Sequence, residues 1–119
     1  MYKISKQFSF SASHVLEHLK DGHPCTRLHG HNYAVTVHLK SEVLNKDGFV
    51  IDYRELKSIK DYIDDQLDHR HLNDVIPGFI TAENIARFLY DQFKPSFPQL
   101  YAIEVSETPS TRAIYEPEC

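Results

Sequence analysis

The residues best suited to chemistry lie between Cys25 and His31, where the sequence reads CTRLHGH. If His29 and His31 begin a strand, their side chains project from the same face, because side chains alternate along a strand with a period of two. His14 ends an earlier segment with a strand-like pattern, so it becomes a third nitrogen ligand if the two strands pair. Three histidines leave one position of a tetrahedral zinc ion open, which is typical of catalytic sites.

The alternative interpretation of His29 and His31 is a pair of histidines on the polar face of a strand. A third histidine near the end of the adjacent strand favours a metal site over that alternative. Imidazole ligands also suit copper, iron and nickel, and it is the open three-histidine arrangement that favours zinc.

Cys25 stands in a turn-rich loop beside Arg27. An isolated cysteine is commonly an inert, small hydrophobic residue. Next to a positive side chain and a divalent cation, however, we expect thiolate character, which proton abstraction or nucleophilic attack requires. In a further alternative, Cys25 is a fourth zinc ligand that closes the site and makes it structural.

Three other acidic or basic positions are candidates for chemistry. Asp68 and His69 are either a solvated pair at a helix end, or a carboxylate that fixes an imidazole tautomer for acid-base work near neutral pH. Glu107, at a strand end, is either a solubilising edge residue or an acceptor of two hydrogen bonds from a guanidine-like edge. Glu83 is assigned to a favourable charge at a helix N-terminus rather than to catalysis.

The hydrophobic pattern predicts the strands that must position these residues. Apolar and polar residues alternate over 2–13 and 32–43, which we expect to form antiparallel neighbours joined by the ligand-bearing loop 15–28. The segments 102–106 and 112–115 are typical of a hairpin around a turn.

Two amphipathic helices are expected between these strand pairs. The first runs from about residue 53 to 67 with Asp52 as its N-cap, and the second follows the N-cap Thr81 and ends before Pro95. With 119 residues, the chain has room for a single domain, residues 1–119. The order of elements predicts an α+β fold with an antiparallel four-stranded sheet and two helices on one face.

The composition excludes several classes of protein. The net charge is −4 and no lysine or arginine cluster is present, which argues against a nucleic-acid partner. No apolar run approaches the roughly 20 residues that span a bilayer, and residues 1–6 lack the apolar stretch of a signal peptide. With only Cys25 and Cys119, a disulfide framework is not expected. We therefore expect a soluble, cytoplasmic protein with no membrane partner.

Several separated motifs together resemble one family over essentially the full chain. They are the His14 strand, Cys25 to His31, Asp52-Tyr53, Leu67-Asp68-His69, Leu72-Asn73, Thr81-Ala82-Glu83-Asn84 and Glu107-Thr108. In this order they are similar to the 6-pyruvoyl-tetrahydropterin synthase/QueD family. The Cys-x-x-x-His-Gly-His spacing looks like that of the 6-carboxy-5,6,7,8-tetrahydropterin synthases, because pyruvoyl-forming relatives typically place two more residues between the cysteine and the first histidine.

The resemblance implies a tunnelling fold (T-fold), in which ββααββ subunits join their sheets into a barrel. It implies a homo-oligomer, commonly a hexamer of two trimers, with active sites at subunit interfaces. The implied reaction converts 7,8-dihydroneopterin triphosphate into 6-carboxytetrahydropterin with release of acetaldehyde and triphosphate, an early step in the synthesis of queuosine and other 7-deazapurines.

The resemblance also implies roles for individual residues. A zinc ion would be bound by the three histidines His14, His29 and His31. Cys25 would be the proton-transfer base, Asp68 and His69 the supporting pair, and Glu107 the anchor of the pterin ring. Arg70 departs from some relatives, which carry a second histidine there.

Other functions compete with the carboxytetrahydropterin synthase. A 6-pyruvoyl-tetrahydropterin synthase would share every ligand and differ in its product. A non-catalytic zinc-binding protein would use Cys25 to close a His3Cys site. A generic zinc hydrolase would need an acidic or basic group beside a metal-bound water, for which Glu107 is the candidate.

Overall fold

The computed structural model describes residues 1–118 and contains one four-stranded antiparallel sheet with the strand order β1-β2-β3-β4. The strands are β1 Tyr2–His14, β2 His29–Ser41, β3 Leu100–Thr108 and β4 Thr111–Tyr115. The predicted pairing of the first two strands and the C-terminal hairpin are both confirmed. The second strand begins at His29 rather than at residue 32, so both histidines of the His-Gly-His sequence belong to it.

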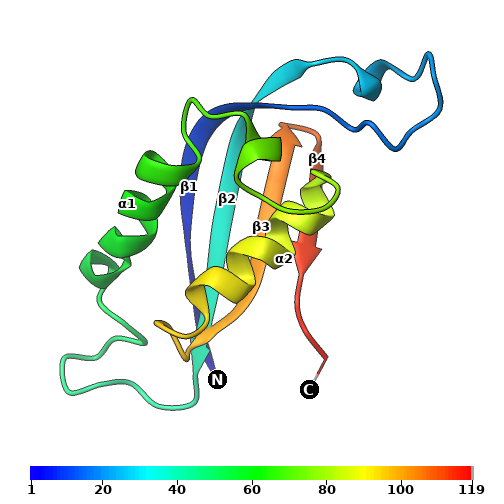
Figure 1. Cartoon of the computed structure of the whole chain (residues 1–119). Coiled ribbons are helices and arrows are strands. Elements are labelled where there is room, and N and C mark those ends of the chain that lie inside the picture. Colours follow the sequence, from blue (N-terminus) through cyan, green and yellow to red (C-terminus); the bar gives the residue numbers. More distant parts are fainter. Residues whose placement is uncertain (119) are drawn as a thin grey trace.

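Two α-helices, α1 Lys57–Gln66 and α2 Ala82–Phe93, lie on the same face of the sheet (Figure 1). The first predicted helix starts differently, because its first turn is a 3-10 helix, η2 Tyr53–Leu56. The side chain of Asp52 accepts a hydrogen bond from the Arg54 N–H and caps that turn. Thr81 caps α2 in the predicted way, with its side chain accepting from Asn84 N–H. The ββααββ prediction is therefore confirmed.

The core lies between the sheet and the helices. On β2 every second residue from Tyr33 to Leu39 is almost fully buried, while the residues between them face the uncovered side of the sheet. Ile59 and Ile63 of α1, and Ile85 and Leu89 of α2, fill the space above. This alternation gives every side chain on β2 a fixed side of the sheet, which decides where the histidines point.

Residues 15–28 project beyond the end of the sheet as a long arm (Figure 1). Its base is tied down by Asn73, of the 3-10 helix η3 Leu72–Asp74, whose amide accepts from the Val15 N–H at 2.9 Å and donates to the Val15 carbonyl at 3.0 Å. The arm contains a further 3-10 helix, η1 Pro24–Thr26. None of the described helices is long and apolar enough to cross a bilayer.

Candidate metal centre and active site

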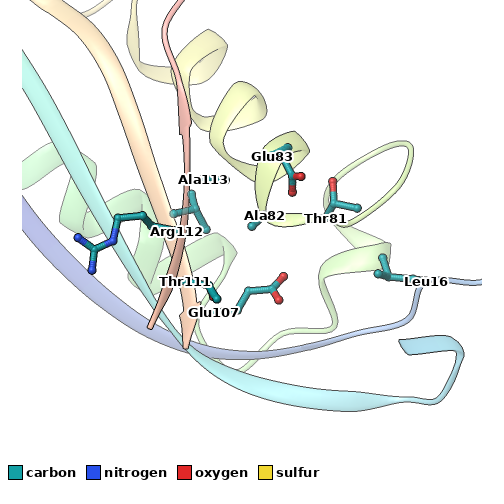
Figure 2. Close-up of a pocket in the computed structure, with 9 residues that line it drawn as sticks. Leu16, Thr81, Ala82, Glu83, Glu107, Thr111, Arg112 and Ala113 are labelled. Carbon is teal, nitrogen blue, oxygen red and sulfur yellow. The ribbon is translucent and has the colours of Figure 1, made fainter. Parts of the chain in front are cut away.

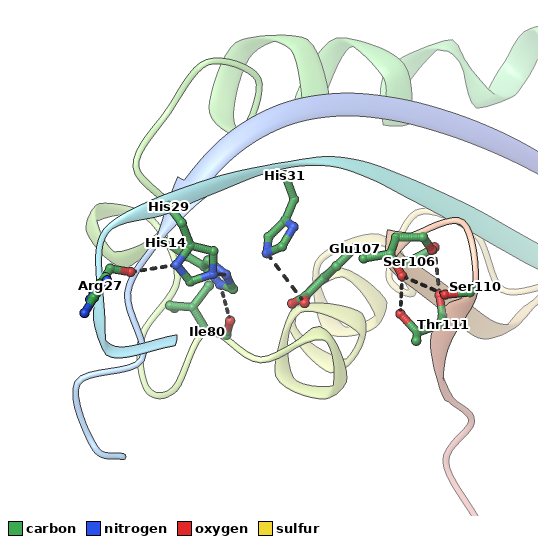
Figure 3. A network of polar contacts seen from close by, with 10 residues as sticks. His14, Arg27, His29, His31, Ile80, Ser106, Glu107, Ser110 and Thr111 are labelled. Atoms are coloured by element: carbon green, nitrogen blue, oxygen red, sulfur yellow. Dashed lines mark hydrogen bonds and ion pairs between the residues drawn. The ribbon is translucent and has the colours of Figure 1, made fainter. Parts of the chain in front are cut away.

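Three histidines meet where β1 ends and β2 begins. His14 is directly opposite His29 in the strand pairing, and His31 follows two residues later on the same face. One nitrogen from each histidine lies within 4.8 Å of the others, and the Nε2 atoms of His14 and His29 are 2.8 Å apart (Figure 3). The predicted juxtaposition of these histidines is therefore present, and they lie close enough together to bind a metal ion.

In His14 and His29, the second ring nitrogen, Nδ1, forms a hydrogen bond with a backbone carbonyl. His14 Nδ1 lies 2.8 Å from the Ile80 oxygen, and His29 Nδ1 lies 2.6 Å from the Arg27 oxygen. A carbonyl accepts only, so each Nδ1 carries the hydrogen and each Nε2 presents a lone pair in the neutral ring. Two lone pairs facing each other at 2.8 Å repel unless a positive charge lies between them. The donor set therefore fits a metal cation.

Burial also favours the ligating form of His14. The residue is 1% exposed, and this burial is the main reason that the pKa of His14 is lowered from its ordinary value. A lowered pKa keeps the imidazole neutral, which is the form that binds metals.

Gly30, between two of the histidines, lies on the opposite face of β2. A Cβ atom at this position would be 3.3 Å from the carbonyl oxygen of Ala12, on the neighbouring strand. That distance is tighter than ordinary contacts, so the glycine permits the close approach of β1 and β2 at the histidine cluster.

Glu107, near the end of β3, points toward this cluster. Its Oε2 lies 3.8 Å from His31 Nε2 (Figure 3). It lines a cavity of about 300 Å³ together with Glu83, which comes from the first turn of α2. Figure 2 shows both carboxylates directed into the space between α2 and the strands, and Arg112 directed away from it. The cavity is therefore lined by two acidic groups next to the histidines.

Glu83 was not identified from the sequence as part of a site. Its position in the first turn of α2 explains it as a helix-stabilising charge, and nothing local shows what lies across from it. The neighbouring Thr81, which lines the same cavity, was assigned only to the helix cap. The fold adds the information that the N-terminus of α2 lies over the end of β3.

Asp68 and His69 form the pair that the sequence suggested. Asp68 Oδ1 accepts a hydrogen bond from the Ser11 N–H at 2.9 Å, and Asp68 Oδ2 lies 2.9 Å from His69 Nδ1. One carboxylate oxygen is thus fixed to β1 and the other orients the imidazole. The hydrogen bonds from Ser11 and then His69 hold the pKa of Asp68 below its ordinary value.

The backbone at His69 is unusual, with φ at 59°, in the left-handed region. The edge of β1 holds it there, because the His69 N–H donates to the Ser11 oxygen and the Ser13 N–H donates to the Arg70 oxygen. Non-glycine residues held in this region occur preferentially at functional sites. His69 and His31 line a common cavity of about 480 Å³, so the Asp68 and His69 pair borders the same space as one histidine of the cluster.

Cys25 is separate from both groups. It lies in η1 on the arm, partly buried against the core, and it is a free thiol. Its sulfur does not belong to the group of ligand atoms made by the three histidines, and Cys25 lines neither of the two cavities just described. The geometry of the described residues therefore does not favour the closed His3Cys site. Cys119 lies outside those residues.

Three of the other histidines make local structural contacts. His18 stacks on Phe79 with ring centroids 3.7 Å apart, and the His23 side chain accepts from the Cys25 N–H at the start of η1. His71 shares a 3.0 Å hydrogen bond with Ser13. The contacts of His71 with Ser13 and of Asn73 with Val15 tie this loop to β1 and to the start of the arm.

The fold and the histidine cluster together define an α+β protein with a metal-binding arrangement on paired strands. The family described as 6-pyruvoyl tetrahydropterin synthase matches residues 3–118, and the chain belongs to this family. The family resemblance inferred from the sequence motifs is therefore confirmed.

Relatives with two different names are similar to the chain at equal identity. The 6-pyruvoyl tetrahydrobiopterin synthase of Dictyostelium discoideum is 33% identical, covering 97% of this chain and 96% of the relative. The 6-carboxy-5,6,7,8-tetrahydropterin synthase of Haemophilus influenzae is also 33% identical, covering 98% and 99%. The solved 6-pyruvoyl tetrahydropterin synthase of Caenorhabditis elegans superposes with a TM-score of 0.86 at 30% identity, covering 98% and 96%. Overall similarity therefore places the chain among the tetrahydropterin synthases without separating the two activities.

Proposed function

We propose that the protein is a zinc-dependent 6-carboxy-5,6,7,8-tetrahydropterin synthase that acts on 7,8-dihydroneopterin triphosphate. The observation that carries the proposal is the group of three histidine nitrogens within 4.8 Å, next to a cavity lined by two carboxylates. The spacing of Cys25 and His29 supports the carboxy product over the pyruvoyl product, since it is the shorter of the two spacings in the family. The products would be 6-carboxytetrahydropterin, acetaldehyde and triphosphate.

In this proposal His14, His29 and His31 hold the zinc ion. Zinc bound there would polarise the side-chain oxygens of the substrate and stabilise negative charge that develops when protons leave carbon. The backbone carbonyls of Ile80 and Arg27 keep two of the imidazoles in the ligating tautomer. The protein thus supplies neutral nitrogens from a rigid sheet.

The two carboxylates of the cavity suit the amino-pyrimidine end of a pterin. Its N–H groups form a flat, guanidine-like edge that can donate two parallel hydrogen bonds to a carboxylate. Glu107 is the proposed anchor, and Glu83 lies on the same cavity. A ring bound at Glu107 would lie next to the histidine cluster, because Glu107 Oε2 is 3.8 Å from His31 Nε2.

Proton transfer is assigned to Cys25 and to the Asp68 and His69 pair. Asp68 holds His69 Nδ1, so His69 Nε2 is directed to the surroundings, and the His69 side chain is 83% exposed. Cys25 lies on the projecting arm, away from the pair. We propose that a second copy of the chain supplies the missing neighbour, in a homohexamer with interfacial active sites in the cytoplasm, within the synthesis of queuosine or another 7-deazapurine.

The test is to incubate the zinc-loaded protein with 7,8-dihydroneopterin triphosphate and to identify the products by mass, with Cys25→Ala as the control. We expect carboxytetrahydropterin and acetaldehyde from the wild type, and about 10²- to 10³-fold slower formation of both from the variant. A pyruvoyl product would assign the sister activity instead. Zinc bound in stoichiometric amount without turnover would overturn the enzymatic proposal.

A further inference from the structure

One buried polar group near the site has no role in the mechanism above. Tyr33 is 1% exposed, and its hydroxyl makes no hydrogen bond with any described residue. Buried hydroxyl groups are nearly always hydrogen-bonded, and leaving one unpaired destabilises the folded state. As a core-filling residue, a phenylalanine would serve better, so the hydroxyl calls for a functional explanation.

The strand pairing places Tyr33 beside Glu107. The pairing of β2 with β3 reaches Ala34 opposite Ser106, and Tyr33 and Glu107 are the next residue on each of the two antiparallel strands. Both side chains lie on the helix-covered face, where Tyr33 is buried and Glu107 lines the cavity. Residues at opposite or diagonal positions of neighbouring strands lie about 5 to 8 Å apart, so the side chains of Tyr33 and Glu107 can interact.

The ring of Tyr33 is held in place by its neighbours. It stacks on Phe10 with centroids 5.0 Å apart and planes 12° from parallel, and it meets the edge of the His31 ring at 5.5 Å. The direction of the hydroxyl is therefore fixed by packing. Glu107, in contrast, contacts His31 at 3.8 Å, longer than a hydrogen bond. A carboxylate that is not firmly held thus lies across from a donor that has no acceptor.

We propose that Tyr33 is a positioning residue for Glu107: its hydroxyl donates a hydrogen bond to the carboxylate when a pterin occupies the cavity. One oxygen of Glu107 is then fixed by Tyr33, and the carboxylate faces the amino edge of the pterin in a single orientation. The inference rests on the proposed function, because it assigns a pterin to the cavity. The inference adds to the cavity of Glu107 and Glu83 a residue that acts on the ligand only through Glu107.

Tyr33→Phe removes only the hydroxyl, and Tyr62→Phe is the matched control. Tyr62 is a half-buried tyrosine whose ring meets Phe93 edge-on, and it lines neither cavity at the site. Neopterin, a fluorescent oxidised pterin, serves as the binding probe. We expect Tyr33→Phe to weaken neopterin binding about tenfold, the effect of one lost hydrogen bond. The KM for the triphosphate substrate should rise by about the same factor with kcat changed less than about threefold.

A purely structural role would give different results. Tyr33→Phe should bind zinc with the wild-type stoichiometry, and its melting temperature should not fall, because the lost hydroxyl was unpaired. In a Glu107→Gln background, the same substitution should weaken neopterin binding by a much smaller factor, since the two residues act together. Wild-type neopterin affinity in Tyr33→Phe, or an undiminished effect in Glu107→Gln, would overturn the inference alone. A wild-type protein that binds no pterin would overturn the proposed function and the inference with it.

Discussion

The histidine cluster and the residues proposed to transfer protons, Cys25 and His69, stand on different kinds of structure. The histidines stand on paired strands, two of them hydrogen-bonded to backbone carbonyls and one almost fully buried. Cys25 and His69 stand on connecting segments, and the His69 side chain is 83% exposed. A metal site needs ligands in a fixed geometry, which the paired strands of one chain provide. Groups that move protons need access to the substrate, and in the proposed function Cys25 and His69 meet only where two copies of the chain are in contact.

The largest effect should come from removing a ligand of the cluster. His29→Ala should abolish stoichiometric zinc binding and lower kcat/KM on the order of 10⁴-fold, through the loss of several kcal/mol of charge stabilisation. Metal analysis after dialysis and a kinetic assay measure the two effects. His38→Ala is the control, since His38 lies on the same strand but on its uncovered face. Retention of zinc by His29→Ala would show that the cluster is not the metal site.

The variant Cys25→Ala should lose turnover without losing zinc, and so distinguish the role of Cys25 from that of the histidine cluster. We expect a fall in kcat of about 10²- to 10³-fold with zinc content unchanged, because a proton-transfer group is lost and no ligand is. Joint loss of zinc and activity would instead make Cys25 a fourth ligand.

Mixing two inactive variants tests whether Cys25 and His69 of different chains form one site. Cys25→Ala and His69→Ala, unfolded together in equal amounts and refolded, should recover roughly a quarter of wild-type activity if the residues meet across a subunit interface. A matched mixture of Cys25→Ala with itself supplies the baseline. Recovery no greater than this baseline would place both groups within one chain.

Asp68→Asn should have a smaller effect on turnover, about tenfold, because His69 remains and only its orientation is lost. The same variant should also change how the stability of the fold depends on pH. Since the folded-state pKa of Asp68 lies below its unfolded value, the ionised carboxylate stabilises the fold above about pH 4. This contribution disappears as the pH falls through the lowered pKa.

Thermal unfolding across this pH range checks the response of Asp68. The difference in melting temperature between wild type and Asp68→Asn should shrink as the pH falls from about 5 to about 3. Asp91→Asn, in a surface ion pair with Arg87 at 4.0 Å, should show little such dependence. A constant difference between wild type and Asp68→Asn would mean that the hydrogen bonds of the Asp68 carboxylate do not stabilise the fold.

The sequence predicts the histidine cluster well because the relevant information is local. A period of two decides the face on which His29 and His31 lie, and the alternation in β1 does the same for His14. Antiparallel pairing of the two strands then brings all three together. The same alternation and the caps Asp52 and Thr81 are why the order of strands and helices could be predicted.

What the sequence could not predict depends on contacts between distant segments. The carboxylate of Asp68 is fixed by the backbone of Ser11, 57 positions away, and Glu83 joins the cavity only because α2 begins over the end of β3. The sequence likewise does not show that the hydroxyl of Tyr33 is unpaired, since a tyrosine at a buried strand position fits the hydrophobic pattern whether or not its hydroxyl has a partner. Periodicity assigns a side chain to a face, and tertiary packing alone decides which groups it meets there.

The smallest expected effect concerns the spacing between the two ligand-bearing strands. In Gly30→Ala the new methyl group meets the Ala12 carbonyl at 3.3 Å, so β1 must move by a few tenths of an ångström at the cluster. Loss of glycine also stabilises the fold by about 0.4–1 kcal/mol through the unfolded chain, which offsets the strain. We therefore expect a melting temperature close to that of the wild type, with zinc affinity reduced by roughly 3- to 10-fold because the nitrogens are displaced.

Competition with a chelator of known affinity measures the change in Gly30→Ala, and Ser9→Ala, on the uncovered face of β1, is the control. Unchanged zinc affinity would mean that the cluster tolerates motion between the strands. In that case the hydrogen bonds of the His14 and His29 rings with backbone carbonyls would determine the ligand positions, and the spacing of β1 and β2 would matter less. A loss of affinity without a loss of stability would locate the rigidity of the metal centre in the close contact of β1 with β2.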